Sequence, residues 1–207
     1  MKRIGLLLLV AFALGMSGCA VGQKVDIGSA AVGSTHVDGS ALYPMSVAVI
    51  EDRPFVISGD KTPDFIGKYR GGYGNPWDVH TAGNVPLATQ IHGDLVKFLQ
   101  NTGFPVVAED AERQVEVRIV NYNFDCFMNC RVWNELYVAI RDENGKPLHS
   151  HIVKIEQAID GSFWVGGKYA LERELPLIYA KMLQSIVYSN PEAMAALTRK
   201  EEAKPLP

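Results

Sequence analysis

Residues 114–159, QVEVRIVNYNFDCFMNCRVWNELYVAIRDENGKPLHSHIVKIEQAI, contain the pattern that decides the fold. Apolar and polar residues alternate over 114–124, 130–141 and 151–159, which is typical of strands with one buried face. Asn144-Gly145, between the second and third runs, is a strong hairpin signal. The stretch therefore predicts three antiparallel strands joined as a meander.

A helix is expected before the meander. Its apolar residues recur at helical spacing at Leu87, Ile91, Leu95, Phe98 and Leu99. Asn84 is expected to cap the start of this helix. Gly103 is expected to end it in a left-handed conformation, with Phe104 folding back on Leu99.

A second long helix is expected after the meander. Its apolar positions are Leu171, Leu175, Ile178, Met182 and Ile186. Pro176 is expected in its first turn or at a kink. Ser189-Asn190-Pro191 predicts the start of a short terminal helix.

The first core strand is expected at Val47-Ala48-Val49-Ile50, a continuous apolar run typical of a strand buried on both faces. Residues 51–85 are expected to be irregular. The order of elements is strand, helix, three-stranded meander, helix. It predicts a single α/β (α+β) domain over residues 45–197, with helices packed on a mixed sheet.

The N-terminus carries a targeting signal. Lys2 and Arg3 precede an apolar run at 4–14, whose 11 residues are too few to span a bilayer core of roughly 30 Å. Met16-Ser17-Gly18-Cys19 resembles the bacterial lipobox. We therefore expect removal of a signal peptide at 1–18 and acylation of Cys19. The alternative is an ordinary secretory signal followed by a chance cysteine.

Two or three acyl chains on Cys19 would hold the protein stably on a membrane, whereas one gives only marginal binding. Ala20 stands where Asp would favour retention at the inner membrane, so enteric sorting rules favour the outer membrane, with the domain facing the periplasm. Residues 19–44 are rich in Gly, Ser and Ala and are expected to form a flexible tether, with a brief strand possible at 23–27. Residues 198–207 are expected to be a flexible charged tail.

The charge balance argues against nucleic acid as a partner. The chain has 20 Lys and Arg against 23 Asp and Glu, and loss of Lys2 and Arg3 with the signal peptide leaves a formal charge of −5. No run of basic residues exceeds two. Nucleic acids and anionic headgroups need clustered positive charge. We expect membrane contact through the acyl chains on Cys19.

Several short motifs, in their order along the chain, resemble the YajG family of bacterial lipoproteins over residues 47–197. They are Val47-Ala48-Val49-Ile50, Asp52-Arg53, Ile66-Gly67 with Arg70 and Gly74, Gly103-Phe104, and Asp160-Gly161-Ser162-Phe163. The wider relatives are auxiliary lipoproteins of transport systems and lipoprotein activators of cell-wall synthases. The resemblance implies their αβ arrangement and no catalytic motif. Cys126 and Cys130 depart from the family pattern.

Catalytic chemistry finds little support in the sequence. Residues 70–74 are glycine-rich but lack the Gly-Lys-Ser/Thr of a phosphate loop, and no Gly-x-Ser-x-Gly elbow occurs. His149 and His151 would project from one face of a strand, and we expect two solvated histidines there rather than a metal site. The sequence therefore predicts no enzyme, no cofactor and no metal.

Cys126 and Cys130 flank a short tip between two expected strands. Opposed strand residues lie within disulfide reach, and the periplasm is oxidising. We expect a disulfide between these cysteines. A metal half-site or a redox pair are the alternatives.

The loop at 60–79 contains the candidate binding residues Tyr69, Arg70, Tyr73 and Trp77. Exposed Tyr, Trp and Arg dominate binding hot spots. The alternative is that these aromatic side chains cover the sheet.

The leading hypothesis is a membrane-anchored, non-enzymatic lipoprotein that binds a protein partner in an envelope assembly or transport system. A carrier for a lipid or another hydrophobic ligand is the alternative, and it would require an apolar cavity between helices and sheet. An envelope hydrolase would require convergent polar groups that the sequence does not offer.

Overall fold

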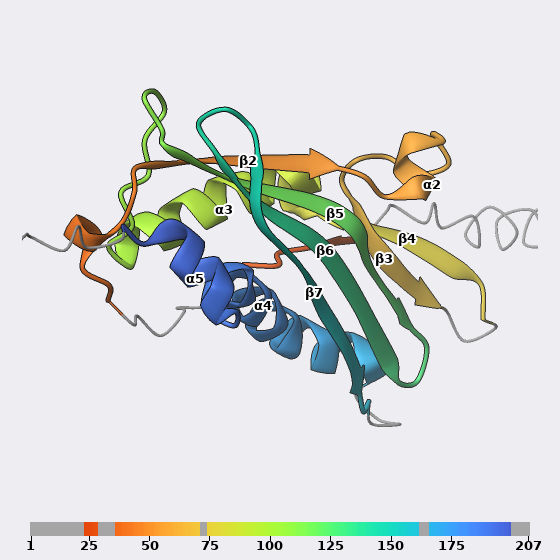
Figure 1. Cartoon of the computed structure of the whole chain (residues 1–207). Helices are drawn as coiled ribbons and strands as arrows, with labels where there is room; N and C mark the ends of the chain where they lie inside the picture. Colours follow the sequence, from red (N-terminus) through yellow and green to blue (C-terminus); the bar gives the residue numbers. More distant parts are fainter. Residues whose placement is uncertain (1–22, 29–35, 71–73, 162–165, 200–207) are drawn as a thin grey trace, which may run out of the picture.

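The computed structural model describes residues 23–28, 36–70, 74–161 and 166–199, which form a mixed sheet with helices packed against it (Figure 1). The predicted α/β domain is confirmed. Its elements are β1 (Gln23–Val25), η1 (Gly39–Ala41), β2 (Met45–Glu51), α2 (Pro54–Ile57), β3 (Phe65–Arg70), β4 (Pro76–Thr81), η2 (Ala82–Asn84), α3 (Leu87–Asn101), β5 (Arg113–Cys126), β6 (Cys130–Asp142), β7 (Pro147–Ile159), α4 (Gly166–Val187) and α5 (Pro191–Leu197).

The sheet has seven strands in the order β1-β4-β3-β5-β6-β7, and β2 also pairs with β5. Strands β5, β6 and β7 form the predicted antiparallel meander. The first half of β5 pairs in parallel with β2, and its end pairs in parallel with β3, so both strands share one edge of β5. Apolar side chains of α3, α4 and α5 join those of the sheet in one buried cluster.

A β-bulge in β5 explains an irregularity in its sequence pattern. The apolar phase set by Val117 and Ile119 reverses at Val120. The pairing with β6 shifts register between Ile119 and Asn121, which returns Tyr122 and Phe124 to the buried face. Both aromatic side chains are fully buried there, so the bulge keeps one continuous core under a long strand.

The C-terminus of α3 has the predicted cap. The Phe104 N–H donates to the Leu99 carbonyl at 2.9 Å, and the Gly103 N–H donates to the Gln100 carbonyl at 3.1 Å. Gly103 has a φ of 95°, which favours glycine. A side chain there would also meet the Val37 carbonyl, because an added Cβ would lie 2.4 Å from that oxygen. The residue therefore both ends the helix and admits a neighbouring segment.

The predicted cap at the start of α3 is wrong. Asn84 lies before the helix in η2, and Pro86 occupies the N-cap position without a side-chain hydrogen bond. The Leu87 N–H instead donates to the Pro63 carbonyl at 3.0 Å. A backbone carbonyl from the segment between α2 and β3 thus accepts a hydrogen bond from an N–H group at the start of α3 that has no partner within the helix.

Two expectations upstream of α3 are also wrong. Residues 51–85 are not irregular, because they contain α2 and the antiparallel pair β3 and β4. Strand β2 is not buried on both faces; Val47 and Val49 are half-buried and Ile50 is 37% exposed. Its pairing explains this, since β2 lies at an edge of the sheet rather than inside it.

Arg53 holds the segment after β2 in place. Its side chain is fully buried and donates to both carboxylate oxygens of Glu51, at 2.7 and 2.6 Å. It also donates to the carbonyls of Phe65 at 2.5 Å and Pro63 at 2.9 Å. One guanidinium therefore joins the end of β2 to the start of β3. The fork of donors on arginine suits this task.

The tether expected at 19–44 is wrong for 23–28 and 36–44. Strand β1 pairs in parallel with β4, as the possible strand at 23–27 anticipated, and Val25 and Ile27 are buried. Leu42 is also buried and forms an antiparallel bridge with Thr198. Both segments therefore belong to the domain. The signal peptide at 1–18, the lipidation site Cys19 and residues 200–207 of the expected tail lie outside the described residues.

The C-terminal helices follow the predicted pattern. All five apolar positions expected to face the core from α4 are buried, and the Asn190 side chain caps α5. Pro176 lies in the interior of α4 rather than in its first turn. Within the part of the chain that the structure describes, no helix combines the length and apolar character needed to cross a membrane.

Candidate functional site

The predicted aromatic site is not a single exposed patch, because Tyr69 belongs to the core. Its side chain is 5% exposed and packs on Phe124, with the ring centroids 5.6 Å apart. The Lys168 ammonium lies over the Tyr69 ring, 5.9 Å from its centroid. The alternative reading, that the aromatic residues of this loop cover the sheet, is correct for Tyr69.

Arg70 binds within its own domain. Its Nε and Nη2 donate to the two carboxylate oxygens of Asp125 at 2.7 and 2.6 Å. These hydrogen bonds hold the pKa of Asp125 below its usual range and raise the pKa of Arg70. Trp77 is 41% exposed, and Tyr73 lies outside the described residues. Of the predicted binding residues that are described, only Trp77 presents an unpaired aromatic surface to solvent.

The predicted disulfide between Cys126 and Cys130 is present, with the two Cα atoms 4.1 Å apart. The two residues are directly opposed at the end of the β5–β6 pair, and both are buried. The bond closes the turn that carries Phe127 and Met128, which are 46% and 59% exposed. It therefore fixes two apolar side chains at the tip of the sheet.

His149 and His151 are expected to be solvated, but the structure shows both side chains partly buried. Their rings lie 5.2 Å apart and are partly buried between β7 and the C-terminal helices. His149 Nδ1 lies 3.4 Å from the Glu192 carboxylate. Burial, and then the neighbouring His149, lower the pKa of His151. No group of three or more His, Cys, Asp or Glu in the described ranges is placed to hold a metal ion.

Folding stability is expected to fall as the pH drops from about 7.5 to 5.5. The pKa of His151 is lower in the folded protein than its ordinary value of 6.5. The unfolded chain therefore takes up a proton first, so acid stabilises the unfolded state below about pH 6.5. Carboxylates with lowered pKa values, such as Asp125, lose their contribution only at lower pH.

Thermal melts of the protein and of His151→Gln across this pH range check the prediction. The substitution should flatten the pH dependence of the melting temperature. An equal slope in both proteins would assign the effect to other groups.

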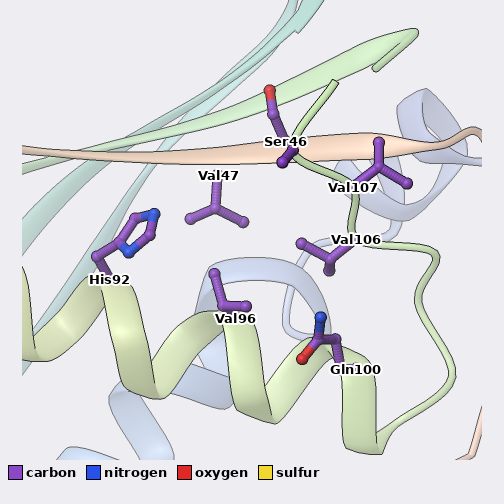
Figure 2. Close-up of a pocket in the computed structure, with 8 residues that line it drawn as sticks. Ser46, Val47, His92, Val96, Gln100, Val106 and Val107 are labelled. Carbon is purple, nitrogen blue, oxygen red and sulfur yellow. The ribbon is translucent and has the colours of Figure 1, made fainter. Parts of the chain in front are cut away.

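An open groove of about 370 Å³ lies between β2 and α3 (Figure 2). Figure 2 shows His92, Val96 and Gln100 projecting from α3 toward Val47 on β2. These helix residues are spaced by four, which places them on one face of the helix. The full lining is Ser46, Val47, His92, Val96, Gln100, Val106, Val107 and Ala108.

Among the described residues, the edge of β2 beside this groove has no partner strand along most of its length. The Met45 N–H donates to the Pro105 carbonyl at 3.0 Å, and the Val107 N–H donates to the Met45 carbonyl at 2.9 Å. Alternate residues of a strand direct their backbone groups to the same side, so Val47 and Val49 face the same edge as Met45. Among the described residues, β2 pairs with β5 along its other edge and with Val106 only through Met45.

The arrangement offers two features to a ligand, which are a row of free main-chain donors and acceptors and an adjoining apolar groove. Sequence reasoning missed this site. The only signal in the sequence is the apolar run at 47–50, which also fits a fully buried strand. The groove depends on a contact between Met45 and Val106, which are far apart in the chain.

The chain was compared with protein families, curated proteins and solved structures. No protein-family model and no curated protein matches it. A Xanthomonas campestris protein of family DUF330 is similar in structure, with 11% identity, a TM-score of 0.49, and coverage of 72% of this chain and 89% of that one. An uncharacterized protein has 12% identity and a TM-score of 0.47, and the match covers 80% of this chain and 96% of that one. A minor lipoprotein from Acinetobacter baumannii has 9% identity and a TM-score of 0.38, and the match covers 77% of this chain and 97% of that one. Functional inference therefore depends on this chain's own residues.

Proposed function

We propose that the chain is a lipid-anchored, non-enzymatic protein of the outer membrane that faces the periplasm and binds a partner protein of an envelope assembly or transport system. The lipobox at Met16-Ser17-Gly18-Cys19 supports the anchor. The disulfide between Cys126 and Cys130 suits an oxidising compartment. Membership of the YajG family is part of the proposal and is supported by the order of its short motifs. No cofactor is involved.

The unpaired edge of β2 is the main observation that supports partner binding. A partner segment in extended conformation would add a strand beside Val47 and Val49 and gain their main-chain hydrogen bonds. Alternate side chains of that segment would enter the groove and contact Val47, Val96 and Val106, which line it. His92 and Gln100 would supply polar contacts at its rim.

The filled core favours this function over a carrier of lipid or another hydrophobic ligand. Such a ligand would lie between the helices and the sheet. The large side chains of Tyr122, Phe124 and Tyr179 occupy that space and are fully buried. Among the described residues, these side chains fill the space that such a ligand would need.

Photo-crosslinking in intact cells tests the partner site. A photoreactive residue at His92 or Gln100, which are exposed in the groove, should crosslink to a partner. The same residue at Lys97, which is exposed on α3 but does not line the groove, should not. Equal yields at all three positions would place partner binding elsewhere.

A matched pair of proline variants tests the role of the β2 edge. Val47→Pro removes an N–H that faces the groove, so crosslinking from His92 should be lost while the fold is kept. Ala48→Pro removes an N–H on the side of β5 and should destabilise the sheet instead. Unchanged crosslinking in a folded Val47→Pro protein would exclude strand addition.

A further inference from the structure

We propose that one end of the domain rests on the lipid bilayer, with Trp77, Phe127, Met128 and Tyr169 in the headgroup region. We call this end the tip surface and define it by these four residues. The inference rests on the proposed acylation of Cys19. It adds a second membrane contact to the lipid anchor and fixes how the domain is oriented.

The length of chain before β1 limits the distance between the domain and the bilayer. Strand β1 begins at Gln23, which pairs with Val79, and Ile27 just beyond it is fully buried. Only residues 20–22 separate Gln23 from Cys19. An extended chain spans at most about 3.6 Å per residue, so these Cα atoms lie within about 14 Å of each other. The domain therefore cannot swing far from an acylated Cys19.

Strand pairing identifies which end lies near the anchor. Strand β1 runs parallel to β4, so Gln23 is the end of β1 that points toward the start of β4. The start of β4 pairs with the end of β3, where Tyr69 opposes Trp77. Tyr69 in turn pairs with Cys126 at the end of β5. The turn between β5 and β6 therefore lies at the same end as the start of β4.

Two further elements meet at this end. Cys130 at the start of β6 pairs with Ile159 at the end of β7. The Lys168 side chain, in the first turn of α4, lies over the Tyr69 ring. In Figure 1 the ends of β3, β5 and β7 and the start of α4 lie together at the lower right. One end of the molecule thus gathers the β5–β6 turn, the disulfide and the N-terminus of α4.

The exposed aromatic side chains gather at this end. Among the described residues, the aromatic side chains exposed by more than a third are Trp77, Phe127 and Tyr169, at 41%, 46% and 64%. Met128, at 59%, is beside them. The other large exposed apolar side chains are all aliphatic and are Ile50, Ile57, Val85, Leu148, Ile152 and Leu177. Tryptophan and tyrosine are the residues enriched where membrane meets water.

The charges at this end neither attract nor repel a bilayer strongly. Arg70 is paired with Asp125, and Lys168 lies 3.8 Å from Glu172. Arg131 and Asp160 are exposed there with opposite charge. The contact would therefore depend on aromatic and apolar side chains, which suits a chain with no basic cluster.

Quenching of tryptophan fluorescence by brominated phospholipids tests the proposal. The acylated full-length protein is placed in vesicles of phosphatidylethanolamine and phosphatidylglycerol with bromine on the acyl chains. The chain has a third tryptophan, Trp164, so every variant carries Trp164→Phe. In that background, Trp77→Phe should remove most of the quenched emission. Trp133→Phe, which changes a half-buried residue on β6 that is not part of the tip surface, should remove much less of it. Quenching that depends equally on Trp133 would overturn the proposal.

A second variant tests the tip without changing a tryptophan. Phe127→Ser with Met128→Ser removes two exposed side chains and should leave the melting temperature nearly unchanged. It should lower the quenching of Trp77 at least twofold. No change in quenching would show that the β5–β6 turn does not contact lipid.

Two controls separate this inference from the proposed function. Mass spectrometry reports the acyl chains on Cys19, and flotation reports vesicle binding. An acylated protein that floats with vesicles while Trp77 is not quenched would overturn the tip surface and leave the anchor intact. A protein without acyl chains would overturn the anchor and this inference together.

Discussion

Arg53→Ala is expected to lower the free energy of unfolding by about 3–5 kcal/mol, the cost of breaking a buried ion pair from one side. The Arg53 side chain is fully buried, and Glu51 is 20% exposed. The substitution leaves that carboxylate without its partner. It also leaves the carbonyls of Phe65 and Pro63 without their donor. Urea denaturation followed by circular dichroism measures the loss.

Two substitutions serve as controls for Arg53. Arg173→Ala removes an arginine side chain that is 76% exposed, and it should change stability by no more than about 0.5 kcal/mol. Arg53→Lys keeps the charge but lacks the fork of donors, so it should recover only part of the loss. Full stability in Arg53→Ala would mean that the segment after β2 is held by other contacts.

Tyr69→Ala is expected to cost about 3–5 kcal/mol, as for other large aromatic side chains removed from a core. The side chain is 5% exposed and packs on Phe124. Trp77→Ala, on the neighbouring strand, should cost clearly less because Trp77 is 41% exposed. Thermal melts of the two variants distinguish the buried from the exposed member of the predicted site.

Tyr69→Phe keeps the ring and removes the hydroxyl, so it separates the contribution of packing to stability from that of the hydroxyl. The Tyr69 hydroxyl is buried and has no hydrogen-bond partner among the described residues, and burial raises its pKa. Its removal should therefore keep or slightly increase stability. A Tyr69→Phe variant as unstable as Tyr69→Ala would show that the hydroxyl makes an essential contact.

The sequence predicts the meander and the end of α3 because local signals decide both. Alternation over β5, β6 and β7 agrees with their burial, and Asn144-Gly145 is the turn between β6 and β7. The Gly103-Phe104 cap depends on residues within one turn of the helix. Structure that depends on neighbours in the chain can be derived from one sequence.

The elements that the sequence misses are short strands whose partners lie far along the chain. Strands β3 and β4 have six residues each, contain Gly67 and Pro76, and lack clean alternation. Strand β1 has three residues and pairs with β4. Their patterns are too brief to be distinguished from loop sequence.

The candidate site is the hardest part to predict. Tyr69 and Trp77 are directly opposed across β3 and β4, yet one is buried and the other is exposed. As residue types, tyrosine and tryptophan are both common in binding sites, so the sequence does not distinguish Tyr69 from Trp77. Tyr69 packs on Phe124 and lies under the Lys168 ammonium, and both contacts depend on how distant parts of the chain come together.

The position of β1 at the edge of the sheet has a consequence for the order of folding. Strand β1 is synthesised early, but its partners at 79–81 follow more than 50 residues later in the chain. Strands β5, β6 and β7 can pair through two short turns before β1 joins the sheet. We therefore expect amide hydrogens of β5 and β6 to exchange most slowly and those of β1 to exchange early. Strand β1 would then be the last to join the sheet and the first to leave it.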